Sequence, residues 1–136
     1  MTERIKGVHR AAPLFFGGLT LASVVVLLLS DAAPRLFAAN AHRILGALPL
    51  ALIAAAYLAY EWARRPSAGE LVKGALLAIA FLFWAANQYW ADSPYATLYN
   101  DIAIALFVLD VFFVIAGWPA SSPDESFGES YKEGGD

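Results

Sequence analysis

The sequence contains no cysteine. That absence excludes thiol redox chemistry, iron–sulfur clusters, covalently attached haem and thiolate zinc sites, since each of these needs cysteine sulfur. Histidine is almost as scarce, with only His9 and His42. The phosphate-binding glycine loop, the HExxH metal motif and the nucleophile elbow are also missing. We therefore expect no cofactor, no bound metal and no enzymatic activity.

Charge is scarce as well. Of the 136 residues, 15% are charged and 60% are hydrophobic, which is too apolar for a soluble domain and indicates a single integral membrane unit. The tail of residues 121–136 holds five acidic residues against one lysine, a net charge of −4. The remaining chain carries about +1, so nothing indicates a nucleic-acid partner. We expect the polar tail to be disordered on the cytoplasmic side.

Four apolar stretches are each close to the roughly 20 residues that a helix needs to cross a bilayer. They are residues 13–30, 41–60, 71–90 and 96–118. The stretches predict an all-α, integral membrane four-helix bundle for residues 1–120. Because the connections between them are short, we expect two antiparallel transmembrane hairpins.

Basic residues are distributed unequally over the two sides of these helices. The side that would carry both chain termini holds Arg4, Lys6, Arg10, Arg64, Arg65, Lys73 and Lys132, and the other side holds Arg35 and Arg43. Basic residues concentrate in the cytoplasmic loops of membrane proteins. We therefore expect a multi-pass protein of a bacterial inner (plasma) membrane with both termini cytoplasmic.

The first apolar run permits a second interpretation. A basic start, the apolar residues from Leu14 to Leu29 and "SDAA" after them fit a secretory signal peptide that is cleaved after Ala32. The run is long for a signal, and Asp31 and Pro34 crowd the cleavage site. We favour a retained first helix, and the cleaved alternative stays open.

An internal repeat supports two equivalent hairpins. Shifted by 60 positions, "APRLFAAN" (33–40) falls on "SPYATLYN" (93–100), so that Pro34 matches Pro94 and Asn40 matches Asn100. A two-helix unit repeats in parallel, about an axis along the membrane normal.

The segment "YWADSPYATLYNDIAIAL" also resembles the two-helix unit of the SPW-repeat proteins, a family of small bacterial membrane proteins named for a Ser-Pro-Trp motif. Tyr95 stands where that family has tryptophan, and the first hairpin has only Ala33, Pro34 and Arg35 at the motif. The resemblance implies a small bacterial membrane protein and transfers no functional residue.

Asp110 interrupts the fourth apolar stretch. It lies about midway between Asp101 and Pro119, which places it near the middle of the bilayer. An ionised carboxylate there costs about 2.5–3.5 kcal/mol, so we expect Asp110 to face other helices and to be protonated or paired. Thr20 and Ser23 are the polar side chains expected at its level. Asp110 would either bind a proton or cation, or act as an interhelical hydrogen bond.

A second group of polar residues is predicted at the opposite, periplasmic ends of the helices. Its members are Asn40, His42, Arg43, Asn87, Gln88, Asp92, Asn100 and Asp101. They would line a shallow polar cluster in which Asp101 pairs with Arg43 or His42, or they would simply cap helices and meet water. His9 and His42 lie on opposite sides, so one chain does not place both on one haem iron.

The second helix carries alanine at every fourth position. Ala47, Ala51, Ala55, Ala59 and Ala63 form a ridge of small residues that lets another helix approach closely. This helix-packing ridge would serve the fold itself or a second copy of the chain. Pro49 in the same stretch removes one backbone hydrogen bond and is expected to bend the helix.

Taken together, these residues predict a non-enzymatic accessory or scaffolding subunit of a membrane complex, or a homo-oligomer. Its partners would be the lipid bilayer and a membrane protein or a second copy. The alternative is a proton- or cation-coupled small-solute transporter or channel that uses Asp110. A second polar group at the depth of Asp110 would favour the transporter. A lipid- or quinone-binding module that uses Trp84 and Tyr99 is a third possibility, without a motif to support it.

Overall fold

The computed structural model describes the backbone of residues 2–119 and the side chains of residues 11–119. The tail of residues 121–136 lies outside this described part, so its predicted disorder stays a prediction. The elements are α1 (Thr2–Ala32), the short 3-10 helix η1 (Pro34–Leu36), α2 (Ala41–Arg64), α3 (Ala68–Tyr89) and α4 (Ala96–Ile115). The all-α prediction is confirmed, and residues 2–119 contain no strand.

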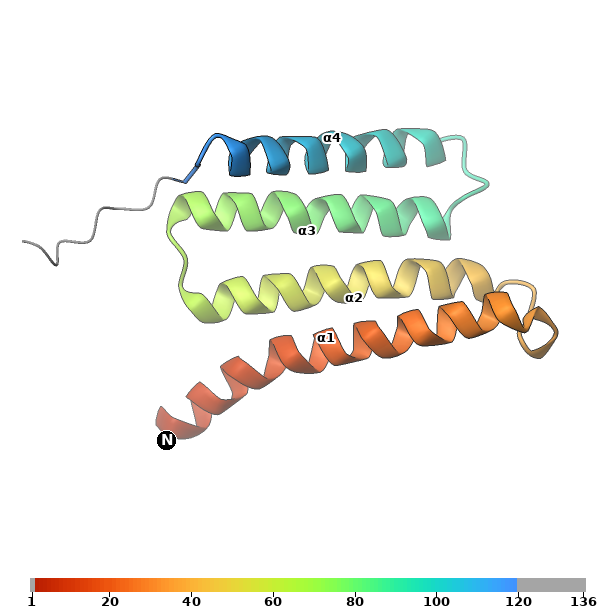
Figure 1. The fold of residues 1–136 in the computed structure, drawn as a ribbon, viewed down its shortest axis with the longest axis horizontal. Coiled ribbons are helices and arrows are strands. Elements are labelled where there is room, and N and C mark those ends of the chain that lie inside the picture. The colour runs from red at the N-terminus through yellow and green to blue at the C-terminus, as the bar shows by residue number, and fades with distance from the viewer. Residues whose placement is uncertain (1, 120–136) are drawn as a thin grey trace, which may run out of the picture.

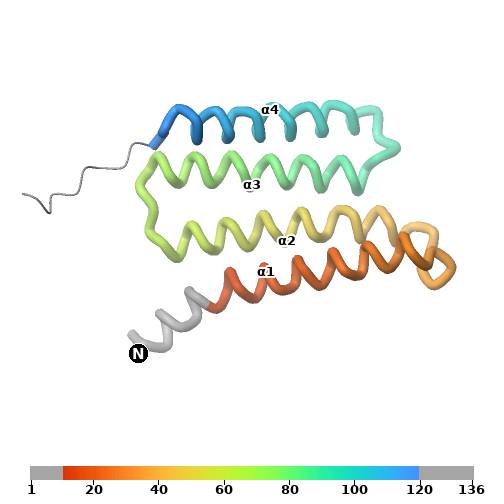
Figure 2. The backbone as a smooth tube through the Cα atoms, in the orientation of Figure 1, coloured from red at the N-terminus to blue at the C-terminus, as the bar shows by residue number. Residues whose placement is uncertain are grey.

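The four α-helices lie side by side in chain order, in a single layer (Figure 1, Figure 2). α1 contacts α2, α2 contacts α3 and α3 contacts α4, and no other pair of α-helices within residues 2–119 is in contact. The arrangement is thus an open row with α1 and α4 at its edges, and the fourth helix does not close onto the first. Lipid solvates apolar helix faces as well as protein does, so nothing forces the two edges together.

The row has two ends that differ in chemistry. We call the end where α2 stops and α3 starts the Arg64 end, and the end that holds the loops of residues 33–40 and 90–95 the Arg43 end. α1 begins and α4 ends at the Arg64 end, so the first and last helical turns lie on the same side of the row (Figure 1).

The helices begin and end at other residues than the apolar stretches indicate. α1 begins at Thr2, so that Pro13 lies inside it, and α2 continues four residues beyond Tyr60 to Arg64. α3 begins at Ala68 because the preceding residues form a capping box. The Ser67 hydroxyl accepts the backbone N–H of Glu70 at 3.3 Å, and the Glu70 carboxylate accepts that of Ser67 at 2.9 Å.

α4 ends three residues earlier than predicted, at Ile115. Gly117 has a φ of 68°, in the left-handed region that ends many helices. Its N–H donates to the carbonyl of Val114 at 3.1 Å, and that of Trp118 donates to the carbonyl of Phe113 at 2.9 Å. The Trp118 ring also packs on that of Phe113, with centroids 4.8 Å apart. These contacts form a Schellman motif, which turns the chain back towards α3.

The residues expected to cap the second and fourth helices play smaller parts. Asn40 occupies the N-cap position of α2 but makes no side-chain cap hydrogen bond. The Ser93 hydroxyl accepts the N–H of Tyr95 inside the loop, at 3.2 Å, and Tyr95 itself precedes α4. Asn100 lies within α4, whereas Asn40 lies in front of α2, so the two matched asparagines differ in their position relative to the helix.

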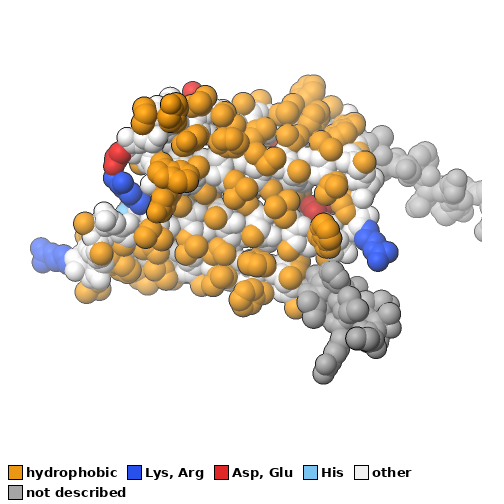
Figure 3. Space-filling model, turned by 180° about the vertical axis from the view of Figure 1, so that it is seen from behind, with side chains coloured by type: hydrophobic (Ala, Val, Ile, Leu, Met, Phe, Trp, Pro, Cys, Tyr) orange, Lys and Arg blue, Asp and Glu red, His pale blue; other side chains and the backbone are white. Residues whose placement is uncertain are grey.

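The side chains between the helices are small, and the large apolar ones point outward. The small buried residues are Thr20, Ser23, Ser30, Ala54, Ala56, Gly74, Ala78, Ala80, Ala85 and Ala103. Leu14 and Ile115 are 78% and 79% exposed. Figure 3 shows hydrophobic side chains over the middle of one face and most charged ones towards the ends. Each of the four helices is long and apolar enough to cross a bilayer, as expected of a multi-pass membrane protein.

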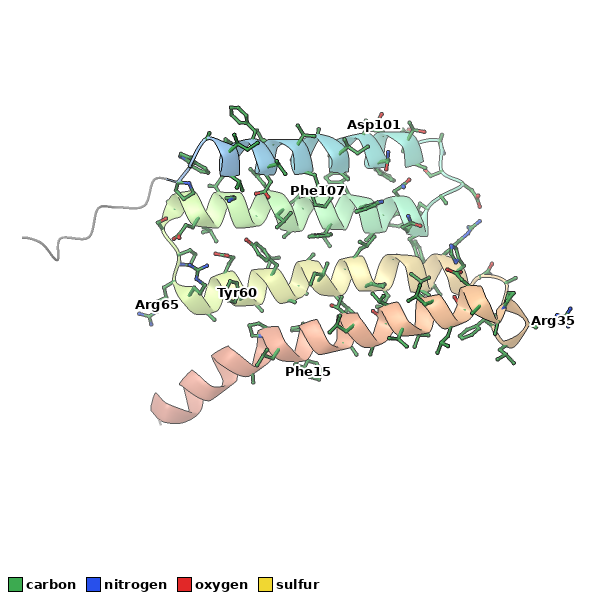
Figure 4. All side chains as sticks on the ribbon, in the orientation of Figure 1. Phe15, Arg35, Tyr60, Arg65, Asp101 and Phe107 are labelled. Atoms are coloured by element: carbon green, nitrogen blue, oxygen red, sulfur yellow. The ribbon has the colours of Figure 1, made fainter. Side chains whose placement is uncertain are left out.

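Aromatic side chains fill the contact between α3 and α4. The Phe107 ring of α4 lies between two rings of α3, with centroid distances of 5.2 Å to Phe81 and 5.8 Å to Trp84 (Figure 4). Both contacts are edge-to-face, the geometry that aromatic quadrupoles favour. α4 is therefore fixed against α3 at a defined rotation, which decides the direction in which Asp110 points.

Candidate functional site

Asp110 lies nearer to the Arg64 end than the sequence indicates. It is five residues before the last residue of α4, and fourteen after the first. At 1.5 Å per residue these separations are about 8 Å and 21 Å. The turn at Gly117 thus ends α4 early and brings Asp110 closer to that helix end, while its expected place near the middle of the bilayer stays a prediction.

The structure does not bring Thr20 and Ser23 to Asp110. Both lie on α1, at the opposite edge of the row, and α1 does not contact α4. The Thr20 hydroxyl donates to the carbonyl of Phe16 at 2.8 Å, and that of Ser23 donates to the carbonyl of Thr20 at 2.7 Å. These bonds satisfy the two buried hydroxyls within their own helix, so they serve the packing of α1.

A different residue, Glu61 of α2, lies near the depth of Asp110. Glu61 is only 4% exposed and is three residues before the end of its helix. Its Oε2 atom is buried and has no hydrogen-bond partner among the described residues, and the same holds for Oδ1 of Asp110. Arg64 approaches Oε1 of Glu61 no closer than 3.9 Å. A half-exposed arginine at that distance offsets little of the several kcal/mol that an unpaired buried carboxylate costs.

Tyr57 lies one turn before Glu61 on the same face of α2, and the charges of Glu61 and Asp110 both act electrostatically on its hydroxyl group. Gly74 of α3 makes room for this arrangement. A Cβ atom at Gly74 would come within 2.9 Å of Glu61 Cγ and 3.2 Å of Tyr57 Cε1. We call Tyr57, Glu61 and Asp110 the carboxyl cluster.

A cleft of about 340 Å³ opens beside the carboxyl cluster, at the Arg64 end. Charged side chains from α2 and α3 line it, and apolar residues from the end of α4 form its other wall. The lining includes Glu61, Arg64, Glu70, Lys73, Val114 and Trp118. The turn after α4 closes this side because Trp118 and Pro119 pack directly against Gly69 of α3. The cleft therefore connects a buried carboxyl group with the surface.

The polar residues predicted to cluster at the periplasmic ends all lie towards the Arg43 end, but most are separate from one another. Arg43 forms an ion pair with Asp92, and His42 Nδ1 lies 3.1 Å from Oδ1 of Asp31. The expected pairing of either residue with Asp101 is therefore wrong. Asp101 is exposed and points away from α3 (Figure 4).

The remaining members of that group do not form a shared site. Asn87, Gln88 and Asn100 are half-buried at helix ends, and Asn40 is exposed. Gln88 contacts the backbone position of Gly46, where a Cβ atom would lie 3.4 Å from its Oε1. A small cleft beside Asp31 and His42 includes none of the other predicted residues. This end offers water-exposed ion pairs and separate polar side chains at the helix ends.

The alanine ridge of α2 does not pack along one helix. Ala47 and Ala51 line an apolar groove with Ala85 and Ala86 of α3. Residues four apart turn by about 40° around the helix axis, so Ala55 and Ala59 lie progressively further round from the groove. The fully buried alanines of α2 are Ala54 and Ala56, on opposite sides of the helix. α2 thus packs on two neighbours through different alanines.

Within the described residues, no three side chains of histidine, cysteine, aspartate or glutamate converge as a metal site would require. The side chain of His9 lies outside them.

Sequence reasoning missed Glu61 because a charge followed by Trp62, Arg64 and Arg65 resembles a membrane interface. Two signals were available in the sequence. Ser67 and Glu70 form the S-x-x-E pattern of a capping box, which places the start of the next helix after Pro66 and leaves Glu61 inside the preceding one. Gly74 offers the space that a buried side chain on the facing helix needs.

No protein-family model, curated protein or solved structure matches this chain. The resemblance to the SPW-repeat proteins accordingly stays a prediction.

Proposed function

We propose that this chain is a non-enzymatic membrane transporter that couples solute movement to the uptake and release of protons or another cation at Glu61 and Asp110. The observation that carries the proposal is the burial of Glu61, with an unpartnered oxygen, near the depth of Asp110. A single intramembrane acid is equally suited to a structural hydrogen bond. Two acids that both lie near Tyr57, one of which, Glu61, opens onto a cleft, are better suited to ion binding.

The physical basis is the cost of charge in a low-dielectric site. A carboxylate that is held out of water without a partner costs free energy, because neither water nor an opposite charge stabilises it. A proton or a bound cation relieves that cost. Occupancy of the carboxyl cluster then depends on which side of the membrane supplies the proton, which is the condition for coupled transport.

We further propose that the Arg64 end faces the cytoplasm of a bacterial cell, with both termini on that side. The excess of basic residues at this end supports the orientation. The cleft beside Glu61 would then open towards the cytoplasm. We retain the parallel repeat of the two hairpins as part of this proposal, on the matching of Pro34 with Pro94.

Infrared difference spectroscopy during a pH titration of the protein in lipid nanodiscs tests the proposal. We expect protonated-carboxyl bands that disappear with Glu61→Gln and with Asp110→Asn. Asp101→Asn is the matched control, since Asp101 is an exposed carboxyl group on the same helix as Asp110. Bands that are unchanged in both cluster variants would remove the carboxyl cluster from the proposed mechanism.

Proton movement supplies the second half of the test. In proteoliposomes with a pH gradient and a trapped pH-sensitive dye, wild type and Asp101→Asn should acidify the lumen on addition of the transported solute. Glu61→Gln and Asp110→Asn should not. Solute-dependent flux that survives both substitutions would contradict coupling through these residues.

A second candidate function, an accessory or scaffolding subunit, is favoured by the open row. Each edge helix contacts only one neighbour in the described part of the chain, and α4 has one buried residue, Ala103. A partner protein or a second copy would cover such an edge. The mass of the complex extracted from its native membrane into nanodiscs distinguishes these cases, and a monomer without partners would reject the subunit role.

A further inference from the structure

The Arg64-end cleft contains charges of both signs in a definite order of depth. Its acidic residue Glu61 is buried, while the basic residue Arg64 has a side chain that is 49% exposed and Lys73 is half-buried. Glu70, at the surface, is already engaged in the capping box. A molecule entering the cleft therefore meets Arg64, Lys73 and the already bonded Glu70 first, and the buried Glu61 carboxyl group at the bottom.

The charged groups in the cleft are poorly satisfied by one another. Oε2 of Glu61 has no partner, and Lys73 forms no ion pair with any described residue. Arg64 is shared between Glu61 at 3.9 Å and Glu70 at 3.8 Å, and both distances are too long for hydrogen bonds. One buried acceptor and one cationic donor thus remain available in the same cavity.

The overall charge of the lining indicates the charge of the ligand. Two acidic side chains, Glu61 and Glu70, are balanced by two basic ones, Arg64 and Lys73. A ligand with a net charge would leave the opposite charge uncompensated at one level of the cleft. A ligand that carries both an ammonium and a carboxylate group matches the buried acid and the outer bases at once.

The remaining wall is apolar. Val114, Trp118 and Pro119 supply it, and the ring of Tyr57 adds an aromatic surface near Glu61. A volume of about 340 Å³ is at the lower end for small-molecule sites, so it suits a compact ligand.

From these contacts we propose that the cleft binds a small zwitterion that carries an ammonium group, a carboxylate group and a short apolar side chain, such as an apolar α-amino acid. The ammonium group donates to Glu61, the carboxylate accepts from Lys73 and Arg64, and the side chain packs on Val114 and Trp118. The inference rests on the proposed function, because Glu61 has to release its proton before its carboxylate accepts the ammonium group.

Three matched probes test this proposal on the wild-type protein in lipid nanodiscs, by isothermal titration calorimetry against empty nanodiscs. They are L-leucine, 3-methylbutylammonium, which lacks the carboxylate, and 4-methylpentanoate, which lacks the ammonium group. We expect leucine to bind at least about tenfold more tightly than either analogue, since each loses one charge-assisted contact. Absence of leucine binding, or equal binding of either analogue, would overturn the proposal.

A variant with a matched control assigns the carboxylate contact. Lys73→Gln should weaken leucine binding at least about tenfold and leave 3-methylbutylammonium unchanged. Arg65→Gln is the control, because this neighbouring base points away from the helices (Figure 4) and should leave leucine binding unchanged. A loss of affinity for leucine and for the amine alike with Lys73→Gln would contradict the assigned carboxylate contact.

The infrared titration separates this proposal from the proposed function. If the carboxyl bands depend on Glu61 and Asp110 but leucine binds no better than its analogues, only the zwitterion site fails. If leucine binds as expected and the bands depend on neither residue, the zwitterion site is supported and the proton-coupled function fails.

Discussion

The two ends of the helix row differ in how their charged side chains are stabilised. At the Arg43 end, Arg43 pairs with Asp92 and His42 lies beside Asp31, and all four side chains are about half exposed or more. At the Arg64 end, Glu61 is buried with an unpartnered oxygen. Paired, hydrated charges contribute little to stability, whereas an unpaired buried one costs several kcal/mol.

This difference shows that the number of polar residues does not identify a site. The Arg43 end has more of them, yet water and short-range pairing satisfy them. The Arg64 end has fewer, but the structure holds one of them, Glu61, out of water with an unpartnered oxygen. A cost of this kind persists where a ligand or a proton relieves it during function. Four predictions test that interpretation, and three of them compare the two ends directly.

The largest expected effect is at Gly74, which makes room for Glu61 and Tyr57. Gly74→Leu should lower the free energy of unfolding by about 1–3 kcal/mol, because even its Cβ atom overlaps both side chains. Gly18→Leu is the control, since nothing lies within 4 Å of the corresponding Cβ position. Both substitutions gain similar helix propensity, so their difference isolates the overlap. Unfolding in mixed detergent micelles measures the free energy of unfolding of both variants. If the two substitutions change it equally, the carboxyl cluster is loosely packed.

The second effect has the opposite sign. Glu61→Met should raise the free energy of unfolding by about 1–2 kcal/mol, because an apolar side chain of similar size replaces an unpaired buried carboxyl group. Asp31→Asn at the other end should change it by less than about 0.5 kcal/mol. The same micelle unfolding experiment applies. A destabilised Glu61→Met protein would mean that Glu61 has a structural partner, and the contrast between the ends would disappear.

The third effect compares two helix caps. Ser67→Ala should cost about 1 kcal/mol, since it removes a hydroxyl that accepts the N–H of Glu70 at 3.3 Å. Asn40→Ala should have almost no effect, because the Asn40 side chain makes no cap hydrogen bond. Circular dichroism during unfolding measures both. If Asn40→Ala lowers the free energy of unfolding more than Ser67→Ala does, the cap at the Arg43 end stabilises its helix more than the cap at the Arg64 end.

Much of the fold was predictable because a membrane imposes a simple pattern. Four runs of about 20 apolar residues suffice to place four helices. The order of packing was not predictable, since an apolar face looks the same whether it meets lipid or another helix. That is why Thr20 and Ser23 were expected near Asp110 although α1 and α4 lie at opposite edges.

The site was predictable only in part, for the same reason. Asp110 stands out as an acid within an apolar run, but its depth depends on the turn at Gly117, where α4 ends. Glu61 was hidden because it stands next to a basic, aromatic segment that resembles an interface. Only the contact with Gly74 across the helix pair shows that Glu61 points inward.

The smallest expected effect is the response of the two arginines to salt. Arg43→Gln should cost less than about 1 kcal/mol at low salt, because its ion pair with Asp92 is exposed. At about 1 M salt, where the screening length is about 3 Å, that cost should vanish. Arg64→Gln should behave differently, since the side chain of its neighbour Glu61 is only 5% exposed and salt does not screen a buried partner well. Unfolding of both variants at two salt concentrations measures this. High salt would then abolish the stability loss of Arg64→Gln as completely as that of Arg43→Gln only if Glu61 is hydrated in solution. That result would show that the two ends do not differ in how water reaches their charged groups.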